Sequence, residues 1–288
     1  MRASVRIAIV MPAGPRDDVA DTLESILRYS DPSRVILVID DTQGSNESFQ
    51  RMCRRHSADV VVMPAPAGLP AGCFGGLWTK MAAAFGWLLE NYQPQLVMRI
   101  DTDALLLGEG LEERAERVFA SNPLIGLLGS YRIGPDGGQR DFSWPARQIR
   151  STAGFRGRLH PRRRSVVRRY LELARSHGYV DGEHVLGAAY ILSNSAIRAI
   201  EQNGWLASQW PPSAMIGDDH IVSMLTAAAG YQIEDFGGPA DPMALKWVGL
   251  PAHPAELLAQ GKLVTHSVRS WQHLSEAEIR GIFAAARE

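Results

Sequence analysis

Two aspartates close an apolar segment near residue 100, in the run Val97-Met98-Arg99-Ile100-Asp101-Thr102-Asp103. Residues two apart on a strand point the same way, so both carboxylates can face one point where the strand ends. Anionic oxygens in that arrangement suit a hard divalent cation, which usually keeps several waters and also binds substrate phosphates. The spacing therefore predicts a metal and phosphate site, against the alternative of an acid-rich turn at a strand end.

Two further segments carry side chains that suit such a site. Gly217-Asp218-Asp219-His220 precedes an apolar helical stretch, and His266 ends the short apolar run Leu263-Val264-Thr265. Acids in the first turn of a helix are stabilised by the helix dipole, so capping accounts for one aspartate but not for two. An imidazole at a strand end would complete a metal shell, although a lone histidine is more often structural. Both segments are candidate parts of one site.

The elements that must position these residues follow from hydrophobic periodicity. Strand-like runs at 5–11, 34–39, 59–63 and 96–100 alternate with helical patterns at 17–29, 45–55 and 77–91. This alternation predicts an α/β fold with a parallel sheet covered by helices. In such sheets ligands bind beyond the carboxyl ends of the strands, which is where Asp40, Asp41, Asp101 and Asp103 fall.

The second half of the chain is less regular. Strands are expected at 124–131 and 139–144 around the turn Pro135-Asp136-Gly137-Gly138, and another at 231–236. Helices are expected at 193–203 and 218–229. Ser275-Glu276-Ala277-Glu278 has the pattern of a capping box that opens a last helix. No internal repeat and no linker divides the chain.

Composition excludes several classes of protein. The 288 residues are 45% hydrophobic and 21% charged, which is ordinary for a soluble globular protein and rules out wholesale disorder or a fibrous protein. The net charge of −1 shows no global bias toward nucleic acid. Only three of the 30 basic residues are lysines, which indicates a GC-rich, bacterial genome.

Cysteine content and hydropathy bear on the compartment. Cys53 and Cys73 are the two cysteines of the sequence, too few for a disulfide framework, so a reducing compartment is expected. No stretch approaches the ~20 apolar residues that span a bilayer, and the N-terminus lacks the apolar core of a signal peptide. We expect a cytoplasmic protein without a transmembrane segment, whose oligomeric state the sequence leaves open.

The order of these motifs resembles that of GT-A-fold glycosyltransferases, most closely the fringe-like β-1,3-glycosyltransferase branch. Lys80-Met81-Ala82, about twenty residues before Asp101-Thr102-Asp103, is similar to the Lys-Met helix and acidic triplet of that branch. Gly187-Ala188-Ala189-Tyr190-Ile191-Leu192-Ser193 is similar to its Gly-Ala-Gly-Tyr-x-Leu-Ser segment. Gly217-Asp218-Asp219 resembles its paired acids, and Val264-Thr265-His266 its metal-binding histidine. The likeness spans roughly residues 5 to 270.

The sequence departs from this pattern in identifiable places. Thr102 stands where the triplet often has an acid, which is tolerable because that side chain should point away from the metal. Ala189 replaces a glycine, which would relax a close backbone approach. Relatives of the branch often carry a membrane anchor and a disulfide-rich domain, and this sequence shows neither. Acceptor and compartment therefore do not transfer from the resemblance.

The resemblance implies a single GT-A domain over 1–288, with a nucleotide-binding half at 1–108, an acceptor and metal half at 109–272 and a C-terminal helix at 273–288. It implies transfer of a sugar from a nucleotide-diphosphate sugar, with UDP expected first, to an acceptor hydroxyl with inversion. The metal, Mn²⁺ or Mg²⁺, would be bound by Asp101, Asp103 and His266, with Asp101 also within reach of the ribose. Asp219 would be the catalytic base, with Asp218 second. The nucleotide sugar would also meet Asp40, Lys80 and Gly187.

Acceptor contacts are less defined by the sequence. Seven arginines lie within 156–169, and such a run is usually a solvated face. Its functional interpretation is capture of an anionic acceptor such as a phospholipid-linked sugar, since arginine forks match phosphate. The acceptor would be a small molecule, a lipid-linked group or a glycan, with no nucleic-acid partner. Sugar-stacking candidates, of which most are expected in the core, are Trp144, Trp205, Trp210, Trp247 and Trp271.

Two other functions fit part of the pattern. A haloacid-dehalogenase-like phosphatase also pairs a strand-end Asp-x-Asp with a later Gly-Asp-Asp. That class has Thr or Val two residues after the second Asp, where this sequence has Leu105, and it places the pair near the start of the chain. A non-catalytic nucleotide-sugar-binding protein is the third interpretation. The joint presence of Asp101, Asp103, Asp219 and His266 argues against loss of catalysis.

Overall fold

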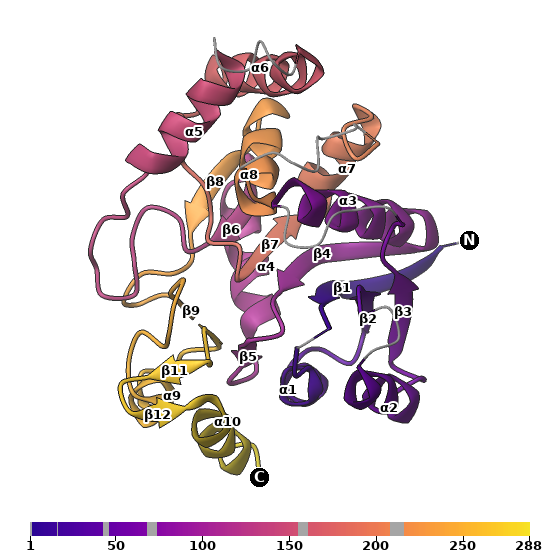
Figure 1. The fold of residues 1–288 in the computed structure, drawn as a ribbon, viewed down its shortest axis with the longest axis vertical. Helices are drawn as coiled ribbons and strands as arrows, with labels where there is room; N and C mark the ends of the chain where they lie inside the picture. The colour runs from indigo at the N-terminus through magenta and orange to yellow at the C-terminus, as the bar shows by residue number, and fades with distance from the viewer. Residues whose placement is uncertain (1, 16, 43–45, 68–73, 155–160, 208–215) are drawn as a thin grey trace.

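The computed structural model describes the chain apart from residues 1, 16, 43–45, 68–73, 155–160 and 208–215 (Figure 1). A seven-stranded sheet in the order β3-β2-β1-β4-β7-β6-β8 forms its centre. Its strands are β1 (Ala3–Ala13), β2 (Arg34–Asp40), β3 (Val60–Pro64), β4 (Tyr92–Ile100), β6 (Ile125–Gly129), β7 (Ala189–Ser193) and β8 (Gln232–Asp235). All pairings are parallel except those of β7. The predicted α/β class with a mostly parallel, helix-flanked sheet is confirmed.

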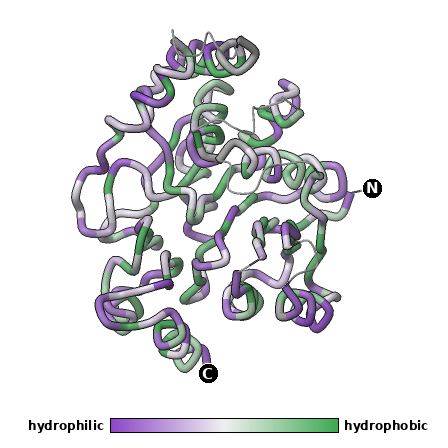
Figure 2. Tube along the Cα trace, viewed as in Figure 1, coloured by the Kyte–Doolittle hydropathy of each residue, from purple (hydrophilic) through white to green (hydrophobic). Residues whose placement is uncertain are grey.

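Helices cover both faces of the sheet because the strands are apolar on both. In β1, Ala8 and Val10 belong to one core, while Ile7 and Ile9 belong to the other. The first core packs against α3 (Phe74–Asn91), α6 (Pro161–Ser176), α7 (Asn194–Gln202) and α8 (Asp218–Ala228). The second packs against α1 (Ala20–Tyr29), α2 (Glu47–Arg55) and α4 (Leu111–Ser121). Figure 2 shows the hydrophobic residues concentrated along the central strands.

One predicted strand is wrong. At 139–144 only Gln139 makes a bridge, with Ile133, and the chain then enters α5 (Ser143–Ala153). Pro145 accounts for the difference, because a proline has no N–H for a sheet ladder but fits the first turn of a helix. The carboxylate of Asp141 accepts hydrogen bonds from the backbone N and Oγ of Ser143 at 2.8 and 2.9 Å, which fixes the entry to α5.

A second, three-stranded sheet carries the late histidine. It pairs β10 (Val264–His266) with β5 (Ala104–Leu106) on one side and β9 (Met243–Leu245) on the other. The short helix α9 (Pro254–Ala259), the hairpin of β11 (Ser270–Trp271) and β12 (Leu274–Ser275), and α10 (Glu276–Ala285) close a third small core. The predicted capping box at Ser275 and Glu278 is present. In the register of this sheet, His266 lies opposite Ala104, directly after Asp103.

Two further observations concern the helices and the cysteines. In the parts of the chain that the structure describes, every helix is too short or too polar to traverse a bilayer. Cys53 is a free, buried thiol, and Cys73 lies outside the described residues.

Candidate active site

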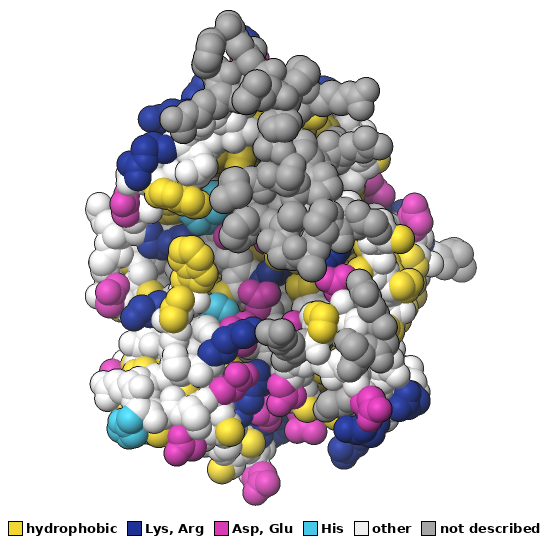
Figure 3. All heavy atoms as spheres, viewed as in Figure 1, with side chains coloured by type: hydrophobic (Ala, Val, Ile, Leu, Met, Phe, Trp, Pro, Cys, Tyr) yellow, Lys and Arg dark blue, Asp and Glu magenta, His cyan; other side chains and the backbone are white. Residues whose placement is uncertain are grey.

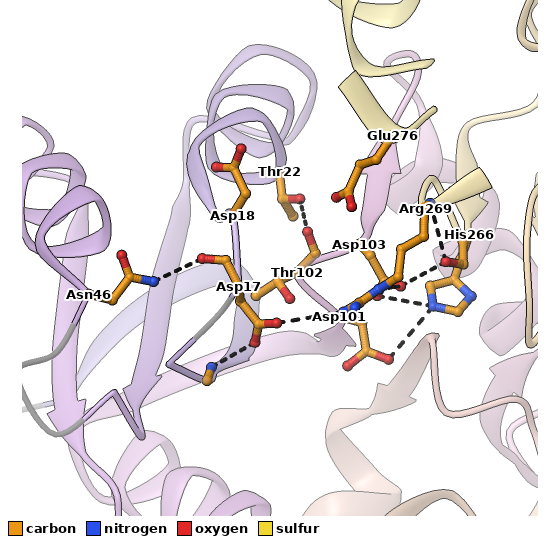
Figure 4. Close-up of polar contacts among 12 residues, drawn as sticks. Asp17, Asp18, Thr22, Asn46, Asp101, Thr102, Asp103, His266, Arg269 and Glu276 are labelled. Carbon is orange, nitrogen blue, oxygen red and sulfur yellow. Dashed lines mark hydrogen bonds and ion pairs between the residues drawn. The ribbon is translucent and has the colours of Figure 1, made fainter. Parts of the chain in front are cut away.

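The two sheets bring the predicted metal ligands together. β4 delivers Asp101 to the carboxyl edge of the large sheet, where its backbone N donates to the Ala188 carbonyl at 2.8 Å. The pairing of β5 with β10 then places His266 Nε2 3.1 Å from Asp103 Oδ1 and 4.0 Å from Asp101 Oδ2 (Figure 4). Three side chains separated by up to 165 residues in the sequence therefore share one point.

The contacts around this point hold one oxygen of each carboxylate. Asp101 Oδ1 forms an ion pair with Arg99 Nη2 at 2.8 Å, and Asp103 Oδ2 accepts hydrogen bonds from Arg269 Nε at 2.7 Å and from Ser267 Oγ at 2.8 Å. Each carboxylate thus turns its other oxygen toward His266.

The imidazole is oriented by its second nitrogen. His266 Nδ1 lies 2.7 Å from the Lys246 carbonyl, which can only accept, so Nδ1 carries a hydrogen. Nε2 points at Asp103 Oδ1, 3.1 Å away, and would present a lone pair to a cation once its own proton is displaced. The three potential ligand atoms lie within 4.8 Å of one another. Two carboxylate oxygens and one imidazole nitrogen suit Mn²⁺ or Mg²⁺, so the residues present fit the metal that the sequence predicts.

Electrostatics keep the central carboxylate ionised. Burial raises the pKa of Asp103, but His266, Ser267 and Arg269 outweigh it and hold that pKa well below its usual range. For Asp101, burial raises the pKa, and the charge of Arg99 opposes the shift. Asp103 is therefore an anion at every physiological pH.

Arg99 connects this cluster to the paired acids at the start of α8. Its guanidinium is buried within β4 and lies 2.8 Å from Asp101 and 3.4 Å from Asp218. The Asp218 side chain is only 5% exposed, and burial raises its pKa above the usual range. Among the described residues, Arg99 Nε, Asp218 Oδ2 and the Tyr190 hydroxyl, all buried, make no hydrogen bond. Asp218 thus faces inward, toward Arg99.

The carboxylate of Asp219 has different partners from that of Asp218. Its Oδ1 accepts the backbone N and ring Nδ1 of His220 at 2.9 and 2.7 Å, while its Oδ2 has no donor among the described residues. Burial raises the pKa of Asp219, but the charge and hydrogen bonds of His220 outweigh it and hold that pKa below the usual range. A Cβ added to Gly187 would lie 3.1 Å from Asp219 Oδ2, so the missing side chain of Gly187 makes room for this carboxylate.

A second cluster of possible metal ligands, formed by His184, Asp219 and His220, has a different chemistry. His184 Nδ1 donates to the Gly182 carbonyl at 2.8 Å, and Arg140 Nη2 donates to Nε2 at 3.2 Å. Neither nitrogen of His184 therefore has a lone pair to spare for a cation. Burial and His220 lower the pKa of His184 to about 3, and the two rings stack with centroids 3.8 Å apart. The neutral His184 supports His220, which in turn holds Asp219.

The predicted nucleotide-binding residues lie further along the same sheet edge. Asp40 Oδ1 accepts the backbone N and Oγ1 of Thr42 at 2.8 and 2.6 Å, which closes the turn after β2. Lys80 on α3 forms an ion pair with Asp41, so it braces the end of β2 and not the Asp101 motif. Asp41 N donates to Ala13 O at 2.9 Å, which places this pair one strand, β1, away from Asp101. A nucleotide role for Asp40 and Lys80 stays a prediction.

A cleft of about 350 Å³ opens beside the cluster. It is lined by Asp17, Asp101, Asp103, Trp247, His266 and Arg269, among others. Acidic side chains gather in the lower central part of the face shown in Figure 3. Of the five candidate stacking residues, Trp247 lines the cleft and is 76% exposed, whereas Trp205 is buried against Tyr170. Trp144 is exposed on α5, Trp271 packs against His253, and Trp210 lies outside the described residues.

Five residues of this region have no role predicted from the sequence: Arg99, Arg140, His184, Ser267 and Arg269. Ser267 and Arg269 follow His266 so closely that a strand-end position was available as a signal. His184 and Arg140 lie in irregular loops, and nothing in their local pattern distinguishes them.

Known proteins match this chain in structure but not in sequence. No family model and no curated protein matches the sequence. Among solved structures, the fold is similar to the crystal structure of galactosyltransferase LgtC in complex with donor and acceptor sugar analogs. That similarity covers 97% of this chain and 95% of LgtC, with a TM-score of 0.49 and 13% sequence identity. Function has to be inferred from the side chains at the sheet edge.

Proposed function

We propose that this chain is a metal-dependent glycosyltransferase of the GT-A type that moves a sugar from a nucleotide-diphosphate sugar, with UDP as the first expected nucleotide, to an acceptor hydroxyl. The observation that carries the proposal is the convergence of Asp101 Oδ2, Asp103 Oδ1 and His266 Nε2 on one point. A further carboxylate, that of Asp219, has an oxygen that accepts no hydrogen bond from the described residues. The order of motifs, which resembles that of GT-A enzymes, supports it.

Asp101, Asp103 and His266 would hold the cation, which when bound neutralises the charge of the departing diphosphate. Lys246 and Arg269 fix the ligands, since the Lys246 carbonyl sets the His266 tautomer and Arg269 holds Asp103 Oδ2. Arg99 holds Asp101 Oδ1 in the same way.

Asp219 would accept the proton of the attacking hydroxyl. His220 fixes its Oδ1, so Oδ2 is the oxygen available to the acceptor. A single displacement with this carboxylate as base would invert the anomeric carbon, which is the outcome we propose. Asp218 is a poorer candidate because its carboxylate is buried against Arg99.

The test is release of nucleoside diphosphate from a panel of nucleotide sugars, with Mn²⁺ or with EDTA. The proposal predicts metal-dependent release from at least one sugar, slow into water and faster with an acceptor. Hydrolysis of a generic phosphate ester instead would support the phosphatase alternative. Binding of a nucleotide sugar without any release would support a non-catalytic binding protein.

Gly187→Ala should lower turnover about tenfold. The new Cβ would lie 3.1–3.3 Å from the Asp219 carboxylate, which must then move by a few tenths of an ångström. A 1 Å misplacement at a reacting group costs about 10²-fold, so a smaller shift costs less. Gly86→Ala on α3 is the matched control, because its Cβ meets nothing within 4 Å and turnover should not change. Unchanged kinetics in Gly187→Ala would contradict the contact.

His220→Gln should change the pH profile. His220 lowers the pKa of Asp219, so its removal raises that pKa and leaves more of the base protonated in acid. We expect the pH below which kcat falls to move upward, with donor KM unchanged. An acidic limb at the same pH as in the parent would show that His220 does not act through Asp219.

A further inference from the structure

Positive charge is concentrated in the segment of α5 and α6, residues 143–176, and the proposed active site does not use it. Ten of the 30 basic residues but only one of the 31 acidic residues lie within 143–176. This stretch therefore carries nine excess positive charges by sequence, while the rest of the chain carries ten excess negative charges. One of those acids, Asp181, pairs with Arg150 and Arg175 at 2.6 Å, so the local excess is smaller by one. A segregation of this size produces a local field that attracts an anionic partner, even though the whole protein is nearly neutral.

The described part of this helix pair presents its basic residues to solvent. Ala146 and Ile149 of α5 and Val167 and Leu171 of α6 are buried, and α6 packs on α8. The exposed residues Trp144, Arg147, Arg168, Arg169 and Leu173 are here called the α5–α6 face. Arg168 also pairs with the exposed Glu172 at 2.7 Å. Figure 1 shows the two helices at the end of the molecule opposite α10, and Figure 3 shows basic side chains along the upper left margin.

Apolar side chains on the same face indicate the kind of partner. Trp144 is 45% exposed and lies three residues from Arg147, and Leu173 is 37% exposed and lies four residues from Arg169. Residues at these spacings share one side of a helix. Tryptophan and leucine beside arginine are typical of helices that lie in the interface of a bilayer. Nucleic acid would also be attracted by the charge and could stack a base on Trp144, but it would leave Leu173 without a partner.

We propose that the α5–α6 face docks on an anionic lipid bilayer. The face begins beside the Asp219 end of the site, because Phe142, just before α5, packs its ring 5.4 Å from His184, which stacks on His220. Docking would bring this end of the site close to the membrane surface. The consequence for substrate, which rests on the proposed function, is an acceptor carried by a lipid.

The experiment is co-sedimentation of the full chain with vesicles of phosphatidylcholine, with and without phosphatidylglycerol, at low and high salt. The chain should bind only the anionic vesicles, and binding should weaken as salt screens the charges. Changing Arg147, Arg168 and Arg169 together to Gln should weaken binding about 100-fold, at about fivefold per arginine. The control changes Arg51, Arg54 and Arg55 on α2, which are equally exposed, and should bind like the parent.

Three results would overturn the proposal. The parent chain could fail to bind anionic vesicles at low salt. Both triple variants could lose binding equally, which would mean that only net charge matters. Single-stranded RNA could displace the chain from vesicles at equal phosphate concentration, which would identify nucleic acid as the preferred partner. None of these readouts depends on glycosyl transfer.

Discussion

Asp219→Asn should lower kcat by about 10²-fold or more while the affinity for the donor barely changes. An alcohol is a poor nucleophile at neutral pH, so the reaction needs a base within hydrogen-bond reach of the acceptor hydroxyl. The variant keeps the shape of the side chain and removes its basicity. The measurement is steady-state turnover with the donor and acceptor that support transfer. Donor binding is measured separately, so that an effect on kcat is distinguished from an effect on KM.

Asp218→Asn distinguishes the two neighbouring acids. Asp218 is buried against Arg99, so the variant should lower thermal stability by weakening a buried charge pair, and should reduce turnover less than Asp219→Asn in the folded protein. If Asp218→Asn abolishes turnover and Asp219→Asn does not, the catalytic base is Asp218 and not Asp219. Full activity in both variants would contradict inversion with a carboxylate base.

Asp103→Asn and His266→Asn should each weaken metal-dependent binding of a nucleoside diphosphate by about 100-fold or more. Loss of a group that merely orients a ligand costs 10–100-fold, and these residues supply ligand atoms themselves. His266→Asn retains an amide able to donate to the Lys246 carbonyl but removes Nε2. Titration calorimetry of UDP with and without Mn²⁺ measures the effect.

Asp17→Asn is the matched control for these variants. Asp17 lines the same cleft but contributes no atom to the cluster. It should keep metal-dependent binding within a few-fold of the parent. Equal losses in Asp17→Asn and Asp103→Asn, or binding of UDP that EDTA does not alter, would show that Asp103 is not a metal ligand.

The sequence predicts most of the first half of the fold because that half depends on local periodicity. Each expected strand from β1 to β4 is present, and Asp40 and Asp101 lie at the sheet edge as expected. The second half depends on pairings between distant segments. β7 lies antiparallel between β4 and β6, and no local pattern specifies that position.

Parts of the site could be predicted and parts could not, for the same reason. Asp101, Asp103 and His266 are recognisable as strand-end residues of suitable chemistry. In the sequence, Arg99 is a single charged residue within an apolar strand. Only the folded chain shows that its guanidinium forms ion pairs with both Asp101 and Asp218. The support of Asp219 likewise depends on the fold, which stacks His184, from a loop, on His220 in the first turn of α8.

The most direct test of the central claim is an anomalous difference map from crystals grown with Mn²⁺ and UDP. The account predicts one strong manganese peak within bonding distance of Asp101, Asp103 and His266, with the diphosphate beside it and Asp219 facing the open side of the cleft. A manganese peak at His184, Asp219 and His220, or bound UDP with no manganese at Asp103, would contradict it.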